Sequence, residues 1–149
     1  MLSRWWFLVA LALALGSGLR AGEATGKYDT VTVPTVKTSI YLGSVTLIAP
    51  TFTRQGSTYN STYTAKVLPF FFANEKGRIA VTITDDDLAR LAKGEAVDFK
   101  GEGRSEDGET RRVEGKATPA DPVSGKLKIR IFVSTRIELI FNTTYRFGK

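Results

Sequence analysis

The sequence contains no cysteine and no histidine among its 149 residues. Without cysteine there is no disulfide framework, no thiol nucleophile and no cysteine-linked lipid anchor. Without histidine there is no imidazole general base, and an ordinary zinc site loses both of its usual ligands. The fold must therefore be stabilised by its core alone, and the length of the chain is sufficient for that. These absences favour a protein that is not an enzyme and that has no cofactor and no metal site.

Long hydrophobic runs are also missing, apart from one near the N-terminus. A positive charge, the apolar run Trp5–Leu15 and small residues ending at Ala24 have the order of a secretory signal peptide. The run is about half the length that a membrane-spanning helix needs. We expect residues 1–24 to be a cleaved signal peptide and residues 25–149 to form a single domain that is secreted or periplasmic. An uncleaved membrane anchor is the alternative.

Alternating apolar and polar side chains dominate the C-terminal stretch Gly125–Phe147. Side chains alternate across a β-strand, so a period of two with one apolar face is typical of strands that border a core. The pattern predicts two strands separated by Ser134–Thr135. Its predicted inward row consists of Leu127, Ile129, Ile131, Val133, Ile137, Leu139 and Phe141.

Helix signals are scarce and gather in Thr84–Gly94, which predicts one short helix near residues 85–93. Thr84 suits the N-cap position, Asp87 stands where its capping-box partner is expected, and Gly94 suits the C-terminal stop. The three aspartates 85–87 can also be considered as a calcium or magnesium site. They lack the alternating oxygen ligands and the glycine of a calcium loop, so we interpret them as helix-capping residues.

The remaining chain reads as short strands joined by turns, with no spacing typical of parallel β-α-β units. One of these turns is predicted at Asn74–Gly77, followed by a strand at Arg78–Ile83. It predicts an all-β fold of about 7–9 strands, either a small antiparallel β-barrel or a β-sandwich, in which the last strand closes against the first. Around the predicted turn Glu106–Gly108, acidic and basic residues interleave, which indicates charge pairing on a solvated sheet face. Arg111 and Arg112, on the strand Thr110–Thr118, are expected to point to opposite faces.

Basic residues alternate along the strand after Gly125, at Lys126, Lys128 and Arg130. Their side chains are expected about 6–7 Å apart on one face, a spacing that suits lipid headgroups or other anionic groups. A solvated face, or an edge strand protected by lysine against aggregation, explains the same row. Nucleic acid is not expected as a partner, because no aromatic residues interleave with the row and the protein is predicted to be exported.

Three consecutive phenylalanines lie in Leu68–Ala73, the most apolar stretch after the predicted signal peptide. Pro69 is expected to open a new strand or a corner. On a strand, Phe70 and Phe72 would share one face and Phe71 would take the other. Core packing at a barrel end explains these residues, and so does one wall of a pocket for an apolar ligand. We therefore take Phe70 and Phe72 as candidate ligand-binding residues beside the basic row.

Together these features predict an exported, soluble binding or structural module. Its expected ligand is an amphiphile or an anionic component of the cell envelope, a lipid among them. A small outer-membrane β-barrel is a second interpretation, since the chain ends on an amphipathic strand with Phe147 near the terminus. A hydrolase that uses a pair of carboxylates is a third.

Overall fold

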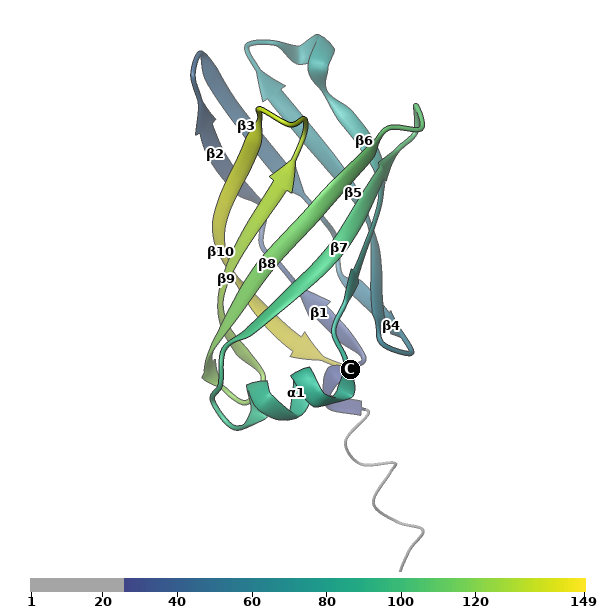
Figure 1. Cartoon of the computed structure of the whole chain (residues 1–149), viewed down its shortest axis with the longest axis vertical. Helices are drawn as coiled ribbons and strands as arrows, with labels where there is room; N and C mark the ends of the chain where they lie inside the picture. Colours follow the sequence, from purple (N-terminus) through teal and green to yellow (C-terminus); the bar gives the residue numbers. More distant parts are fainter. Residues whose placement is uncertain (1–25) are drawn as a thin grey trace, which may run out of the picture.

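The computed structural model describes residues 26–149, which form an antiparallel β-barrel with one short α-helix (Figure 1). This confirms the predicted all-β barrel, whereas the predicted signal peptide lies outside the described residues. The strands are β1 (Thr30–Thr32), β2 (Val36–Ile40), β3 (Gly43–Ile48), β4 (Phe52–Gln55), β5 (Thr58–Leu68), β6 (Glu75–Thr82), β7 (Val97–Ser105), β8 (Thr110–Asp121), β9 (Ser124–Phe132) and β10 (Glu138–Gly148). The helices are α1 (Asp85–Ala92) and two 3-10 turns, η1 (Gly26–Tyr28) and η2 (Phe71–Ala73).

Eight strands close the barrel in the order β5-β4-β1-β10-β9-β8-β7-β6, with β6 pairing back onto β5. The predicted closure of the last strand on the first is present, because β10 pairs with β1. Strands β2 and β3 continue β1 and β4 in an unchanged register, since Val31 pairs with Phe52 and Val36 with Leu47. Pro34 and the Ala49–Pro50 segment interrupt the two ladders at the same level, because proline has no N–H to donate. Two long strands are thereby divided, and the strand number exceeds the prediction.

One seam of the barrel lacks a backbone ladder. β10 pairs with β1 only over Arg146–Gly148, and farther along it faces β2. Within the described residues, β2 pairs with β3 alone and has no ladder to β10. The seam runs toward the end of the barrel that carries the β2–β3, β5–β6, β7–β8 and β9–β10 connections (Figure 1). We call this the open end and the opposite end, where α1 lies, the closed end.

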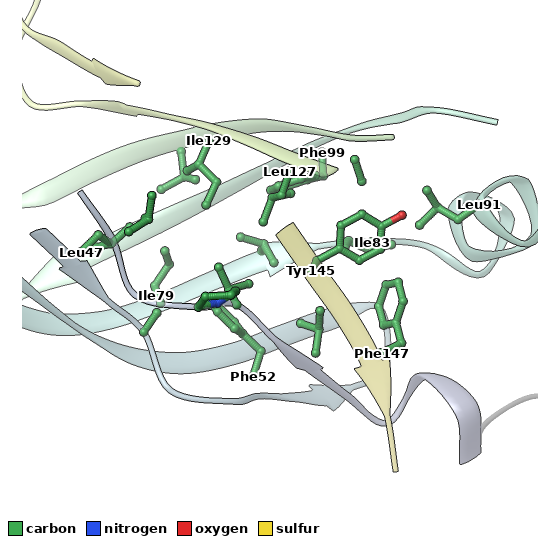
Figure 2. Close-up of a pocket in the computed structure, with 18 residues that line it drawn as sticks. Leu47, Phe52, Ile79, Ile83, Leu91, Phe99, Leu127, Ile129, Tyr145 and Phe147 are labelled. Atoms are coloured by element: carbon green, nitrogen blue, oxygen red, sulfur yellow. The ribbon is translucent and has the colours of Figure 1, made fainter. Parts of the chain in front are cut away.

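Helix α1 covers the closed end of the barrel (Figure 1). The predicted capping box is present: Thr84 Oγ1 accepts from the Asp87 N–H at 3.1 Å, and Asp87 Oδ2 accepts from the Thr84 N–H at 3.0 Å. The helix buries Leu88 and Leu91 against the barrel. Figure 2 shows Leu91 pointing into the side chains of the barrel interior. Gly94 follows the last turn of the helix, and its φ of +88° is a left-handed conformation that glycine adopts without strain.

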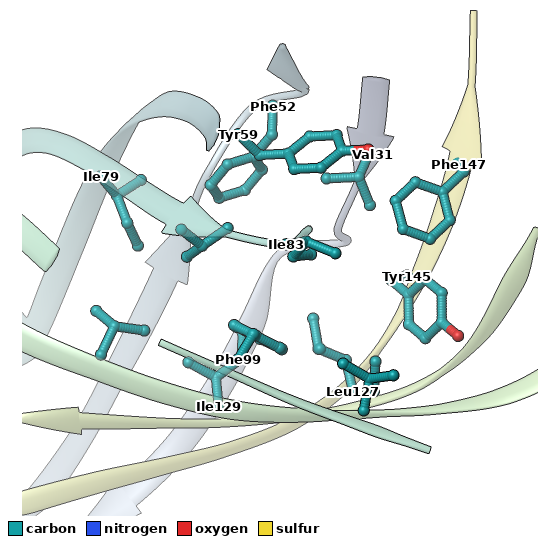
Figure 3. Close-up of a cluster of buried hydrophobic side chains, with 14 of the residues drawn as sticks. Val31, Phe52, Tyr59, Ile79, Ile83, Phe99, Leu127, Ile129, Tyr145 and Phe147 are labelled. Atoms are coloured by element: carbon teal, nitrogen blue, oxygen red, sulfur yellow. The ribbon is translucent and has the colours of Figure 1, made fainter. Parts of the chain in front are cut away.

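Large aromatic side chains fill the closed half of the interior (Figure 3). The ring of Phe147 packs edge-on against Tyr28 and Tyr145, with centroids 5.0 and 5.5 Å away, and lies 6.0 Å from Tyr59. The buried Tyr59 hydroxyl donates to the Tyr28 carbonyl at 2.6 Å. Only about 60 Å³ of space remains among these side chains. This half is therefore a packed core.

Several local predictions need correction. The chain after β5 forms a corner rather than a new strand: it bends through η2, which places Phe71 and Phe72 at the surface, so Phe72 does not share an inward face with Phe70. A turn was expected at Asn74–Gly77, but β6 already begins at Glu75 and so extends the predicted strand toward the open end. Ile137, expected in the inward row, is 53% exposed, because it lies in the β9–β10 connection rather than in a strand.

Charged side chains occupy the outer wall of the barrel. On β7, β8 and β9 the outward rows contain Asp98, Lys100, Lys116, Lys128 and Arg130, which are all exposed. A barrel wall that faces lipid carries an apolar outer band instead, so this wall disfavours the outer-membrane interpretation. None of the helices described between residues 26 and 149 is long and apolar enough to cross a bilayer.

Candidate ligand cavity

The open half of the barrel contains a cavity of about 540 Å³, in contrast to the packed closed half. Leu47, Ile79 and Val113 line this cavity and also the small space below it, so they form the floor between the two halves. A volume of this size lies within the usual range for small-molecule sites. The whole lining comprises Ile40, Tyr41, Leu42, Val45, Leu47, Tyr63, Ala65, Val67, Phe70, Ala73, Glu75, Ile79, Gly103, Arg111, Val113, Ile131, Val133, Ile137, Leu139 and Phe141.

Small side chains on β5 and β7, the two strands that flank β6, explain why this half is hollow. Ala65 on β5 and Gly103 on β7 face the cavity, where the closed half has Tyr59 and Phe99 on the same two strands. β6 lies between these two strands, and aliphatic residues from β3, β9 and β10 line other parts of the wall. The barrel interior is thus filled by aromatic side chains at the closed end and left hollow at the open end.

One polar cluster interrupts the apolar lining, and it consists of Tyr63, Glu75 and Arg111. Arg111 Nη2 donates to Glu75 Oε1 at 2.8 Å, and Arg111 Nε donates to Oε2 at 3.4 Å. The Tyr63 hydroxyl donates to Glu75 Oε2 at 2.6 Å, and Arg111 Nη1 donates to the Val133 carbonyl at 3.0 Å. The cluster therefore connects β5, β6 and β8 with the β9–β10 connection.

Burial and mutual contact shift the pKa values of this cluster. Burial opposes ionisation of Glu75, but the hydrogen bonds from Arg111 and Tyr63 and the charge of Arg111 outweigh it, so its pKa is lowered. The hydrogen bond to Glu75 raises the pKa of Arg111. Burial, followed by the hydrogen bond to Glu75, raises the pKa of Tyr63. At neutral pH the cluster thus holds one carboxylate, one guanidinium and one neutral phenol, and it has no net charge.

The cluster retains hydrogen-bonding capacity for a ligand. A guanidinium has five N–H donors, and the contacts of Arg111 use three of them. The Arg111 and Glu75 side chains are 19% and 20% exposed, so both can be reached from the cavity. Glu75 is the one carboxylate in the cavity lining, whereas the predicted hydrolase needs two carboxylates that flank a bond.

An apolar rim surrounds the mouth of the cavity. We define the rim as the exposed large apolar residues at three open-end connections: Tyr41 and Leu42 between β2 and β3, Leu68 at the end of β5 with Phe71 and Phe72 before β6, and Ile137 between β9 and β10. Tyr41, Leu42 and Ile137 also border the cavity. The rim and the cavity therefore form one continuous apolar surface.

The two phenylalanines predicted as ligand-binding residues occupy different places. Phe70 lines the cavity, as expected for a pocket wall. Phe72 belongs to the rim, is 79% exposed, and does not line the cavity. Its ring packs edge-on against Phe70 at 5.8 Å and against Phe71 at 6.2 Å. The structure therefore separates a pocket residue from a surface residue within one short segment.

The basic row Lys126, Lys128 and Arg130 lies on the outer wall, away from the cavity. Arg130 forms an ion pair with Glu138, and its guanidinium lies 5.6 Å from the centre of the Phe132 ring. Lys128 and Arg130 border an outer depression, and Lys128 lies directly opposite Lys116. The row remains a candidate for anionic groups, but it is separate from the site formed by the cavity.

Sequence reasoning missed the polar cluster, although the strand pattern contains a signal for it. Arg111 has the same parity as Val113 and Ala117, which are inward-facing residues of β8. Glu75 likewise shares the parity of Ile79 on β6. Because the predicted turn at Asn74–Gly77 included Glu75, the predicted strand began too late to show that Glu75 faces inward. The acidic partner expected for Arg111 lay within its own hairpin, whereas its observed partner is Glu75.

Comparisons with family models, with curated proteins and with solved structures found no match to this chain. The site is therefore interpreted from its own geometry.

Proposed function

We propose that this protein is an exported binding protein that holds one amphiphilic molecule in the cavity of its open half. The observation that carries the proposal is the contrast between the two halves of one barrel. The closed half is packed to a residual 60 Å³, whereas the open half leaves about 540 Å³ behind an apolar rim. An unfilled interior lowers the stability of a fold, because its lining loses packing contacts, so a cavity of this size favours a ligand.

The lining supports a fixed orientation for such a ligand. The floor residues Leu47, Ile79 and Val113 are apolar and suit a hydrocarbon chain. The polar cluster lies on strand segments near the open end, with Glu75 as the first residue of β6 and Arg111 as the second of β8. The apolar part of the ligand therefore points to the floor, and its polar head lies at the cluster.

The charges in the cluster also indicate which kind of polar head group the ligand carries. Glu75 neutralises Arg111, so an anionic head would meet a carboxylate that is already ionised. An uncharged head with a hydroxyl or a carbonyl oxygen accepts from the two free Arg111 N–H groups without this repulsion. The proposed ligand class is a lipid-like molecule with an apolar chain and a neutral polar head.

Uptake of N-phenyl-1-naphthylamine, a neutral apolar dye, tests the proposal. We expect the exported protein to enhance the dye's fluorescence, and Ala65→Phe to weaken binding about tenfold or more by filling the cavity. Ala80→Phe is the matched control, because Ala80 faces outward on β6 and lies outside the cavity. Native mass spectrometry after detergent-free purification should reveal a bound lipid in the wild type. Equal dye binding by the wild type and Ala65→Phe would refute the proposal.

A further inference from the structure

We propose that the apolar rim docks on the surface of a lipid bilayer that contains anionic lipid. All but one of the large apolar side chains exposed within residues 26–149 belong to this rim, and Ile140, on the outer wall of β10, is the exception. Tyr41, Phe71 and Phe72 are 98%, 72% and 79% exposed, respectively. Aromatic residues at the tips of separate connections can enter the headgroup region of a bilayer, where their rings are stabilised.

The shape of the rim favours lipid over a folded partner. Its residues project from three separate connections, and the mouth of the cavity lies among them. A rigid protein surface laid across these tips would leave the mouth as a void, which costs packing energy. Fluid lipid adapts to separate tips and also fills the space between them.

Charges near the rim complement an anionic surface. Among the described residues, the acidic side chains that flank the three rim connections are Glu75 and Glu138, and both are ion-paired, with Arg111 and Arg130 respectively. The basic residues Lys66, Lys76 and Arg136 flank or belong to the same connections and form none of the ion pairs found in residues 26–149. Basic residues next to an apolar insertion add electrostatic attraction to anionic headgroups.

The fourth open-end connection differs from the other three. The β7–β8 turn contains Glu106, Asp107 and Glu109 and none of the exposed large apolar residues. Acidic residues are repelled by an anionic surface, so this turn should stay away from the bilayer. Docking through the other three connections therefore implies a tilted barrel.

Two other occupants of the rim fit the structure less well. A second copy placed rim to rim would bring Lys66, Lys76 and Arg136 of both chains together, and like charges at an interface oppose association. Residues 1–24 are the predicted signal peptide, which the exported protein would no longer carry. A lipid surface has neither disadvantage.

Vesicle flotation tests the docking directly, without any ligand for the cavity. We expect the exported protein to bind vesicles made from equal parts of phosphatidylcholine and phosphatidylglycerol. The double variant Phe71→Ser and Phe72→Ser should lose about tenfold or more in vesicle affinity, because the inserted apolar area is removed. Ile140→Ser, on the outer wall of β10, is the matched control and should bind like the wild type. Both variants share the wild-type N-terminus, so their difference reports on the rim alone.

A charge-reversal pair tests the electrostatic part. Lys66→Glu with Arg136→Glu should weaken binding to these vesicles about tenfold or more, and added salt should reduce that difference. Lys126→Glu with Lys128→Glu changes the net charge equally, but on the outer wall, and should have little effect. Stronger loss from the outer-wall pair would overturn the rim proposal and assign binding to the basic row instead.

A spectroscopic readout separates insertion from simple adhesion. Both tryptophans of the chain are at positions 5 and 6, within the predicted signal peptide. After its removal, Phe72→Trp would place a single tryptophan on the rim, and its emission should shift to the blue and be quenched by brominated lipid. Ile140→Trp should show neither effect. Identical spectra for the two reporters with and without vesicles would overturn insertion.

Failure of docking and failure of ligand binding remain distinguishable. Ala65→Phe should lose dye binding and keep vesicle binding, since Ala65 lies inside the cavity. Vesicle affinity that is unchanged in the Phe71/Phe72 double variant would overturn docking and leave the proposed ligand site intact. A lipid-free dimer that this variant converts to a monomer would assign the rim to a second copy and also overturn docking.

Discussion

Two buried tyrosines in the closed half, Tyr59 and Tyr145, differ in whether their hydroxyl group has a hydrogen-bond partner. The Tyr59 hydroxyl donates to the Tyr28 carbonyl, and burial raises the pKa of Tyr59 to about 12. The Tyr145 hydroxyl is buried and has no hydrogen-bond partner within the described residues. Burial of a polar group without a partner is costly, whereas removal of one member of a bonded pair leaves the other unsatisfied.

The two phenylalanine variants should therefore have different stabilities. Tyr59→Phe should lower the free energy of unfolding by about 1 kcal/mol, because the Tyr28 carbonyl loses its donor. Tyr145→Phe should leave it unchanged or raise it, since only an unpartnered hydroxyl is lost. Urea unfolding of both variants measures the difference. A larger loss for Tyr145→Phe would show that its hydroxyl has a partner in solution.

Glu75 should give the protein a component of acid sensitivity. Its pKa is lowered in the folded state, so the stabilisation it provides is fully present above the ordinary carboxyl value of 4.5 and is lost as the pH falls through the folded value. Glu75→Gln should be less stable at neutral pH by about 2 kcal/mol, because the Arg111 charge loses its partner. It should also lose less stability than the wild type on acidification.

The free energy of unfolding, measured for both proteins from pH 7 down to the pH at which the wild type unfolds, tests this expectation. Glu106→Gln makes the same change in net charge at the exposed β7–β8 turn and serves as the control. Parallel pH profiles for the wild type and Glu75→Gln would contradict the role assigned to the cluster.

At the scale of elements, the strands with regular alternation and the helix could be predicted from the sequence. In β9 and β10 the alternation identified the buried residues Leu127, Ile129 and Phe141, because period two is a local property of a strand. The capping box of α1 could be predicted for the same reason, because its two residues lie three positions apart in the sequence. Leu68–Ala73 could not be predicted in this way, since consecutive phenylalanines fit a strand, a corner or a turn, and long-range packing decides among these.

Strand β2 should be the least protected part of the sheet. It pairs only with β3, whereas β9 lies between β8 and β10. Amides that lack a second ladder open with less energy. We expect hydrogen exchange in Val36–Ile40 to be about tenfold or more faster than in Ser124–Phe132, measured by mass spectrometry. β1, in the same stretch of chain but paired on both sides, is the internal control. Equal protection of β2 and β9 would mean that the seam is closed in solution.

For the whole molecule, the sequence predicted a barrel and left open whether its interior was filled. The answer depends on which residues meet across the interior. Ala65 and Gly103 are unremarkable as single positions, and they border one cavity because the pairing of β5, β6 and β7 brings these strands together in the barrel wall. The pairing of Glu75 with Arg111 likewise spans 36 positions and no local pattern indicates it. Register across distant strands is the information that the local patterns lack.

The break at Pro34 and Ala49–Pro50 also affects the girth of the barrel. Below the break, β1 connects β4 to β10, so hydrogen bonds fix the circumference of the closed end. Above it, β2 and β10 lie beside each other, and no backbone ladder joins them within the described residues. The diameter of the open end can therefore increase without the loss of a backbone hydrogen bond. Ligands of different thickness should then bind with nearly equal loss of free energy in the barrel wall, while the closed end keeps its dimensions.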